Sequence, residues 1–298
     1  MFKKYVLFGH TLALFTMLVW ASTFSVTKIL LHDFYVTEIL LFRFIIAYLA
    51  LFILHPKGIG FKNSTIEILF ALSGLSGVCL YFLLENIALY YTTASNAAIL
   101  VTISPLFVAI LSYLFLGIQL KKQFFIGFVV AFIGVALVVS RGELSFSISP
   151  VGDIICLTAG IMWSFYTILL ERLFWHCKDE NPLAITRKIF FYGILCILPF
   201  SIGVWNIYGI DDFWIRFGDF MNLFNLLFLG LIASALCYVS YNACIHFLGI
   251  IRASAYIYSI PLFGVIIATL TLGESMTFAT IIGGIVVLFG LFLSQKAP

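Results

Sequence analysis

The chain has 298 residues, of which 63% are hydrophobic and only 10% are charged, and its formal net charge is +3. A soluble domain carries roughly 25% charged residues, so this composition excludes a protein whose whole surface faces water. The small positive charge gives no reason to expect a nucleic-acid partner. We therefore expect an all-α integral membrane protein.

Ten apolar stretches follow one another with short polar connections. A helix needs about 20 apolar residues to cross the hydrocarbon core of a bilayer, and the first stretch is too long for the core of a signal peptide. We expect ten transmembrane helices, near residues 8–30, 36–54, 66–90, 95–116, 123–140, 150–173, 183–204, 221–246, 252–272 and 278–295. These helices use nearly the whole chain and leave no room for a soluble ATPase domain.

Lysine and arginine are distributed unevenly over the predicted connections. Positive residues concentrate on the cytoplasmic side of membrane proteins. With the N-terminus inside, the outer side holds only Lys28, Arg43, Arg141 and Arg216. The inner side holds the other twelve, which are Lys3, Lys4, Lys57, Lys62, Lys121, Lys122, Arg172, Lys178, Arg187, Lys188, Arg252 and Lys296. Both termini are therefore predicted to be cytoplasmic.

The second half of the chain repeats the first. An offset of 156 positions matches Gly74 with Gly230, Asn86 with Asn242, Pro105–Phe107 with Pro261–Phe263 and Gly134 with Gly290. We predict two five-helix repeats, residues 1–143 and 144–298. Because five is odd, the second repeat enters the membrane from the opposite side, and inverted repeats are common in secondary transporters. Common ancestry without transport is the alternative.

Several motifs resemble the EamA-type branch of the drug/metabolite transporter superfamily over nearly the full chain. They are WASTFSVTKIL from Trp20, LLFRFIIAY around Arg43, YFLLENIALYYTTASNAAILVTISPLF from Tyr81 and LGESMTFATIIGGIVVLFG from Leu272. The resemblance implies a central cavity lined by the first, third, fourth, sixth, eighth and ninth helices, with the fifth and tenth as peripheral scaffold. It implies no cofactor, and it leaves the substrate open because family members carry amino acids, nucleotide-related metabolites, amines and drugs.

Glu85 lies inside the third predicted helix, where a charged side chain costs about 2.5–3.5 kcal/mol on insertion scales. Helical spacing places it on one stripe with Gly74, Gly77 or Val78, Tyr81 and Ala88. We expect Glu85 and Tyr81 to line a binding cavity, with Glu85 binding an amine or carrying a coupling proton. The alternative is a structural partnership of Glu85 with Arg43, Lys28 or a backbone amide.

Aromatic and amide residues recur at matched or neighbouring positions of the two halves. An aromatic pocket beside a carboxylate suits an organic cation or an aromatic amine. The predicted substrate-binding set beyond Glu85 and Tyr81 is Trp20, Trp163, Tyr238, Tyr241, Asn242 and Tyr258. Packing is the alternative for each aromatic residue, and cross-helix hydrogen bonding for Asn242.

Three further polar or backbone features have two interpretations each. Pro105 and Pro261 each remove a backbone hydrogen bond from a helix, so each predicts a hinge or a static kink. Arg43 lies several residues inside the second helix, where an ion pair or a side chain extended to the interface is favoured over binding a substrate carboxylate.

Together these features predict a multi-pass transporter of the bacterial inner membrane that works by alternating access, as a monomer or a homodimer. Export of a small amino-acid-like or amine metabolite is the leading prediction, coupled to protons or another gradient. Import of an organic cation or amine is the alternative. A membrane-embedded enzyme is disfavoured, because Glu85 has no second acid, base or nucleophile beside it in the sequence pattern. No metal site is predicted.

Overall fold

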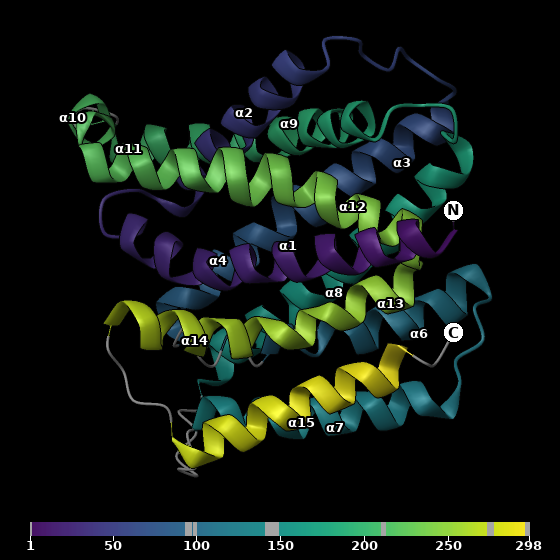
Figure 1. Cartoon of the computed structure of the whole chain (residues 1–298). Helices are drawn as coiled ribbons and strands as arrows, with labels where there is room; N and C mark the ends of the chain where they lie inside the picture. The colour runs from purple at the N-terminus through teal and green to yellow at the C-terminus, as the bar shows by residue number, and fades with distance from the viewer. Residues whose placement is uncertain are drawn as a thin grey trace.

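The computed structural model describes residues 2–92, 97, 100–140, 149–209, 213–272 and 277–295, and every regular element in these ranges is helical (Figure 1). The side chains of Lys3, Lys4, Arg141 and Lys296 lie outside the described set, as do residues 93–96, 98, 99 and 273–276 of the quoted motifs.

Nearly all of the helices run roughly along one axis, and both termini lie at the same end of the bundle (Figure 1). The first half comprises α1 (Phe2–Leu30), α2 (Val36–Leu54), α3 (Ser64–Gly74), the π-helix η1 (Leu75–Leu80), α4 (Tyr81–Tyr91), α6 (Ser104–Leu116) and α7 (Lys122–Ser140). The second half comprises α8 (Pro150–His176), α9 (Pro182–Tyr208), α10 (Phe213–Gly218), α11 (Phe220–Leu227), the π-helix η2 (Phe228–Leu236), α12 (Cys237–Leu248), α13 (Ile250–Ala255), the 3₁₀-helix η3 (Tyr256–Ser259), α14 (Ile260–Leu272) and α15 (Phe278–Gln295).

Each predicted span coincides with a helix or with consecutive helical segments. Within the described residues, six continuous helical stretches are long and apolar enough to cross a membrane. They are Val6–Leu30, Val36–Leu54, Ser64–Tyr91, Pro150–His176, Pro182–Ile207 and Phe220–Leu248. Shorter apolar helices cover Ser104–Leu116, Lys122–Val138 and Phe278–Ser294. Ten membrane crossings and cytoplasmic termini stay predictions.

The helices begin and end at positions that follow the internal repeat. The segments α3, α4, α6 and α7 begin at Ser64, Tyr81, Ser104 and Lys122, and α11, α12, α14 and α15 begin 156 positions later. The last residues of the π-helices, Leu80 in η1 and Leu236 in η2, are also 156 positions apart. The two halves therefore share backbone irregularities as well as residues, which indicates that the repeat is structural.

Pro105 and Pro261 stand in the first turn of α6 and α14. A turn at residues 102–103 precedes α6, and η3 precedes α14. Proline is well tolerated in a first turn because the amide hydrogen it lacks would have no partner there. The prolines thus follow breaks in the helices and remove no hydrogen bond from a helix interior, so a hinge or a kink at these positions stays a prediction.

Matched glycines bring helices into close contact. A Cβ atom at Gly74 would lie 2.6 Å from the amide nitrogen of Gly193 in α9, and one at Gly230 would lie 2.6 Å from Cβ of Ile46 in α2. The helices α7 and α15 pack face to face along their length (Figure 1), through Gly134 against Gly283 and through Gly290 against Ala131. Without a hydrophobic driving force in lipid, such small faces let helices associate by close packing.

Replacing Gly290 with alanine should destabilise the fold, because the new Cβ would lie 2.4 Å from the backbone nitrogen of Ala131. Overpacking of this kind costs about 1–3 kcal/mol. A thermal unfolding measurement on purified protein should give a lower Tm for Gly290→Ala. Gly264→Ala is the matched control, since no atom of the described residues lies within 4 Å of its added Cβ. Equal Tm values for the two variants would contradict the packing.

Candidate functional site

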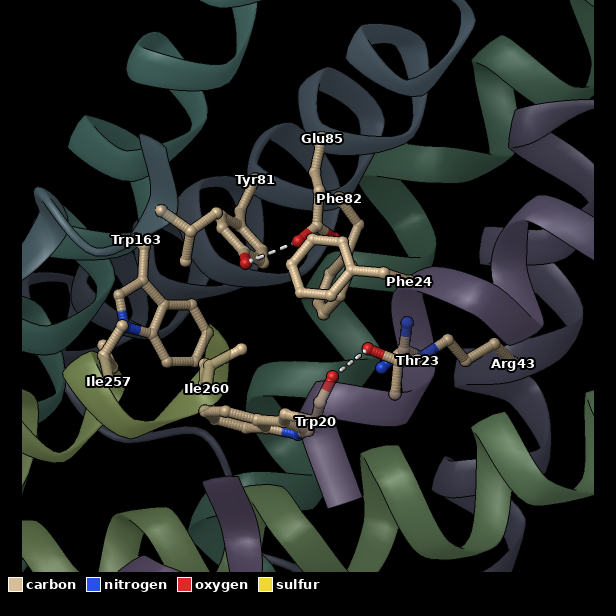
Figure 2. A pocket seen from close by; sticks show the side chains of 11 residues that line it. Trp20, Thr23, Phe24, Arg43, Tyr81, Phe82, Glu85, Trp163, Ile257 and Ile260 are labelled. Carbon is tan, nitrogen blue, oxygen red and sulfur yellow. Dashed lines mark hydrogen bonds between the residues drawn. The ribbon is translucent and has the colours of Figure 1, made fainter. Parts of the chain in front are cut away.

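A pocket lies in the interior of the bundle, between helices of both halves (Figure 2). Its free volume is about 30 Å³, which is enough for only a few water molecules. Its lining residues are Trp20, Thr23, Phe24, Arg43, Tyr81, Phe82, Glu85, Val101, Trp163, Ile257 and Ile260. In this conformation the pocket is therefore nearly closed.

Glu85 reaches this pocket from α4 and is only 7% exposed. Tyr81, one helical turn earlier on α4, donates its hydroxyl hydrogen to Oε1 of Glu85 over 2.8 Å. The stripe predicted from the sequence is divided by the π-helix η1. Gly77 packs against the ring of Tyr166, and only Tyr81 and Glu85 of the stripe face the pocket (Figure 2).

Arg43 reaches the same pocket from α2 and is 1% exposed. Its Nε donates to Oγ of Ser234 over 2.5 Å, and its guanidinium carbon lies 4.2 Å from the centroid of the Phe82 ring. The Nη2 atom is buried and has no hydrogen-bond partner among the residues that the structure describes. A buried cation with an unused donor is costly in an apolar interior. The interpretation of Arg43 as a side chain extended to the interface is therefore wrong.

The pocket thus combines a carboxylate and a guanidinium that do not bond to each other. Within the described residues no ion pair joins Glu85 to Arg43, and Lys28 is exposed. The substrate-binding set predicted from the sequence does not include Arg43, although Arg43 lines the pocket. Its position inside an apolar span was the available signal, because the same argument had singled out Glu85.

Aromatic rings form one side of the pocket. Trp20 on α1 and Trp163 on α8 meet edge to face, with centroids 5.3 Å apart, and both line the pocket (Figure 2). Nε1 of Trp20 donates to the carbonyl of Ala233 over 2.9 Å. Trp20 and Trp163, which an offset of 143 positions pairs between the two halves, are thereby brought together.

Tyr238 and Tyr241 on α12 support these tryptophans without lining the pocket themselves. The Tyr241 ring lies 5.3 Å from the centroids of both Trp20 and Trp163, and the Tyr238 hydroxyl donates to the carbonyl of Gly77 over 2.6 Å. We call Trp20, Tyr81, Trp163, Tyr166, Tyr238 and Tyr241 the aromatic cluster. Tyr81 precedes Glu85 along α4, and Tyr166 follows Trp163 along α8, so the cluster extends from the pocket toward the start of α4 and the end of α8.

Asn242 and Tyr258 lie away from the pocket and are 0% exposed. Oδ1 of Asn242 accepts from the Tyr166 hydroxyl over 2.8 Å, and its Nδ2 donates to Oγ1 of Thr186 over 2.9 Å. The Tyr258 ring lies 6.2 Å from that of Phe128 on α7. Their geometry favours cross-helix bonding for Asn242 and packing for Tyr258.

The helices around the pocket only partly match those the resemblance implied. Lining residues come from α1, α2, α4, α8, η3 and α14, and from position 101. The tyrosines of α12 pack against the tryptophans without lining the pocket, whereas Arg43 of α2 lines it directly. Among the described residues, no three His, Cys, Asp or Glu side chains gather as a metal site would require.

Asn242→Ala should lower stability by about 1–3 kcal/mol, because it leaves the buried Tyr166 hydroxyl without its acceptor, whereas the Thr186 hydroxyl keeps its bond to the carbonyl of Pro182. Thermal unfolding of the purified variant measures this loss. Asn206→Ala is the control, since Asn206 is an exposed residue of α9. An unchanged Tm in Asn242→Ala would contradict the structural role.

Comparison with known proteins agrees with this architecture. The model of the EamA-like transporter family matches residues 7–140 and 150–295. An uncharacterized transporter of Archaeoglobus fulgidus is 29% identical over 297 residues, covering 96% of both chains. A protein of Streptantibioticus cattleyicolor named a probable terminal-alkyne amino-acid exporter is 24% identical, covering 94% of this chain and 91% of its own.

A solved structure titled "Crystal structure of protein" superimposes with a TM-score of 0.74 over 99% of this chain and 97% of that one, at 13% identity, and so supports the fold alone. The family match spans both halves that build the pocket and agrees with the apolar spans of a multi-pass cell-membrane protein. The chain belongs to the EamA-like transporter family.

Proposed function

We propose that this protein is a secondary exporter of a small zwitterionic metabolite of the amino-acid class, which it binds between Glu85 and Arg43. The observation that carries the proposal is a buried carboxylate and a buried guanidinium that line one pocket without bonding to each other. A substrate ammonium group would pair with Glu85, and its carboxylate would take the unused Nη2 donor of Arg43. Such a ligand satisfies both buried charges at once.

The aromatic walls give the pocket a second selectivity. Trp20, Trp163 and Phe24 surround the charged pair with apolar surface, which suits a side chain of moderate size and permits cation–π contact with an ammonium group. The relative named as an amino-acid exporter supports the same substrate class. An amine without a carboxylate is the second candidate, because Glu85 with the aromatic rings is sufficient to hold it.

Transport requires the pocket to open, because about 30 Å³ cannot contain an amino acid. Two inverted repeats provide alternating access when one bundle rocks against the other around a central site. We place the moving points at the matched breaks before Pro105 and Pro261 and at η1 and η2. The aromatic cluster would then be the barrier toward the predicted cytoplasmic side. Glu85 would bind the coupling proton when substrate is absent.

Glu85→Gln should slow proton-driven uptake of labelled amino acids into liposomes by about tenfold or more, equivalent to about 1.4 kcal/mol. The remaining rate should lose its dependence on pH, because an amide cannot exchange a proton. Glu180→Gln is the control, since Glu180 pairs with Lys62 in a connection far from the pocket. Uptake by Glu85→Gln at the wild-type rate would remove Glu85 from the mechanism.

Arg43→Gln should distinguish the two substrate classes. If Arg43 binds a carboxylate, this variant loses about tenfold or more in affinity for amino acids, while binding of the corresponding decarboxylated amines is retained. Ligand-dependent shifts in Tm measure both affinities on the same sample. An equal loss for amino acids and amines would contradict carboxylate recognition, and Lys57→Gln in the exposed α2–α3 connection controls for the lost positive charge.

A further inference from the structure

A second cavity opens on the outside of the bundle, away from the central pocket. It is a groove of about 380 Å³ between α3 with η1 on one side and α6 on the other, with α8 as its floor. The lining is apolar except for two residues. It consists of Leu72, Leu75, Ser76, Leu80, Phe115, Met162, Phe165, Ile168, Leu169 and Arg172.

The length of the groove matches one leaflet of a bilayer. Along α8 it extends from Met162, near the middle of the helix, to Arg172, one turn before its end. Ten residues of α-helix span about 15 Å, which is half of the roughly 30 Å hydrocarbon core of a membrane. Arg172 is therefore at the depth of the lipid headgroups when the wall of the groove faces the acyl chains.

The polar groups of the groove are arranged for a ligand with one charged end. The Ser76 hydroxyl is used internally, because it donates to the carbonyl of Leu72 over 2.7 Å. Arg172 donates from Nη2 to the carbonyl of Phe115 at the end of α6 over 3.0 Å. A guanidinium has five donors, so this bond positions Arg172 and leaves others for an anion. The lining residues include no carboxylate.

We propose that the groove binds one anionic phospholipid, with an acyl chain along α8 and its phosphate at Arg172. Lys121 and Lys122 follow the end of α6 to which Arg172 bonds, and they add to the attraction for an anionic headgroup. The site is separate from the central pocket and does not depend on which substrate is transported. The proposed occupant of the groove is a lipid and not a second copy of the chain.

The experiment uses full-length protein in nanodiscs that contain equal amounts of phosphatidylglycerol and phosphatidylcholine. After transfer to mild detergent, native mass spectrometry counts the lipids that stay bound to each chain. Wild-type protein should retain one phosphatidylglycerol in preference to phosphatidylcholine. Arg172→Gln should reduce that preference about fivefold, since one basic residue at the surface contributes about 1 kcal/mol.

Two control variants distinguish binding of the lipid headgroup from binding of its acyl chain. Leu169→Trp fills the groove and should reduce retention of both lipids, whereas Lys57→Gln, in a connection away from the groove, should retain both. Soluble glycerol phosphate should not displace the lipid. Three results would each overturn the proposal in variants that keep the wild-type Tm. They are displacement of the lipid by glycerol phosphate, an equal preference for phosphatidylglycerol in Arg172→Gln and wild type, and a second protein chain in place of the lipid.

Discussion

The energetic problem of this molecule is the burial of two opposite charges inside a bundle of apolar helices. Glu85 and Arg43 are both below a tenth exposed, and an uncompensated charge at such depth is expensive in a bilayer. Tyr81, Ser234 and the Phe82 ring each offset part of this cost. Among the described residues the Nη2 donor of Arg43 has no partner, and the carboxylate of the proposed substrate would offset that remaining cost.

The surrounding scaffold makes the burial possible through close backbone contacts. Glycines let η1 approach α9 and let η2 approach α2, and α2 is the helix that carries Arg43. The most extensive glycine contact, between α7 and α15, lies away from the pocket. The bundle thus combines a closely packed peripheral pair with a centre whose helices are interrupted by π-helical segments, a 3₁₀-helix and first-turn prolines.

Those interruptions are concentrated near the site. A π-helix precedes α4, which carries Glu85, and η3 precedes the part of α14 that lines the pocket. π-helical segments are frequent at functional sites and weaken the regular hydrogen-bond ladder. The two π-helices occur at matched positions, so each half of the chain has one irregular helical segment of this kind. The same π-helix η1 also lines the groove on the outside of the bundle.

The sequence by itself determined the helical class, the extent of the apolar elements and the repeat, because these depend on local hydrophobic patterns and on glycine and proline spacing. It also identified Glu85, Tyr81, Trp20 and Trp163, all of which line the pocket. Only the tertiary structure decided the rest. Helical phase is shifted within η1 by its extra residue per turn, and partners such as Ser234 lie nearly 200 positions from Arg43. No pattern along the chain could therefore show that Arg43 lines the pocket while Asn242 and Tyr258 do not.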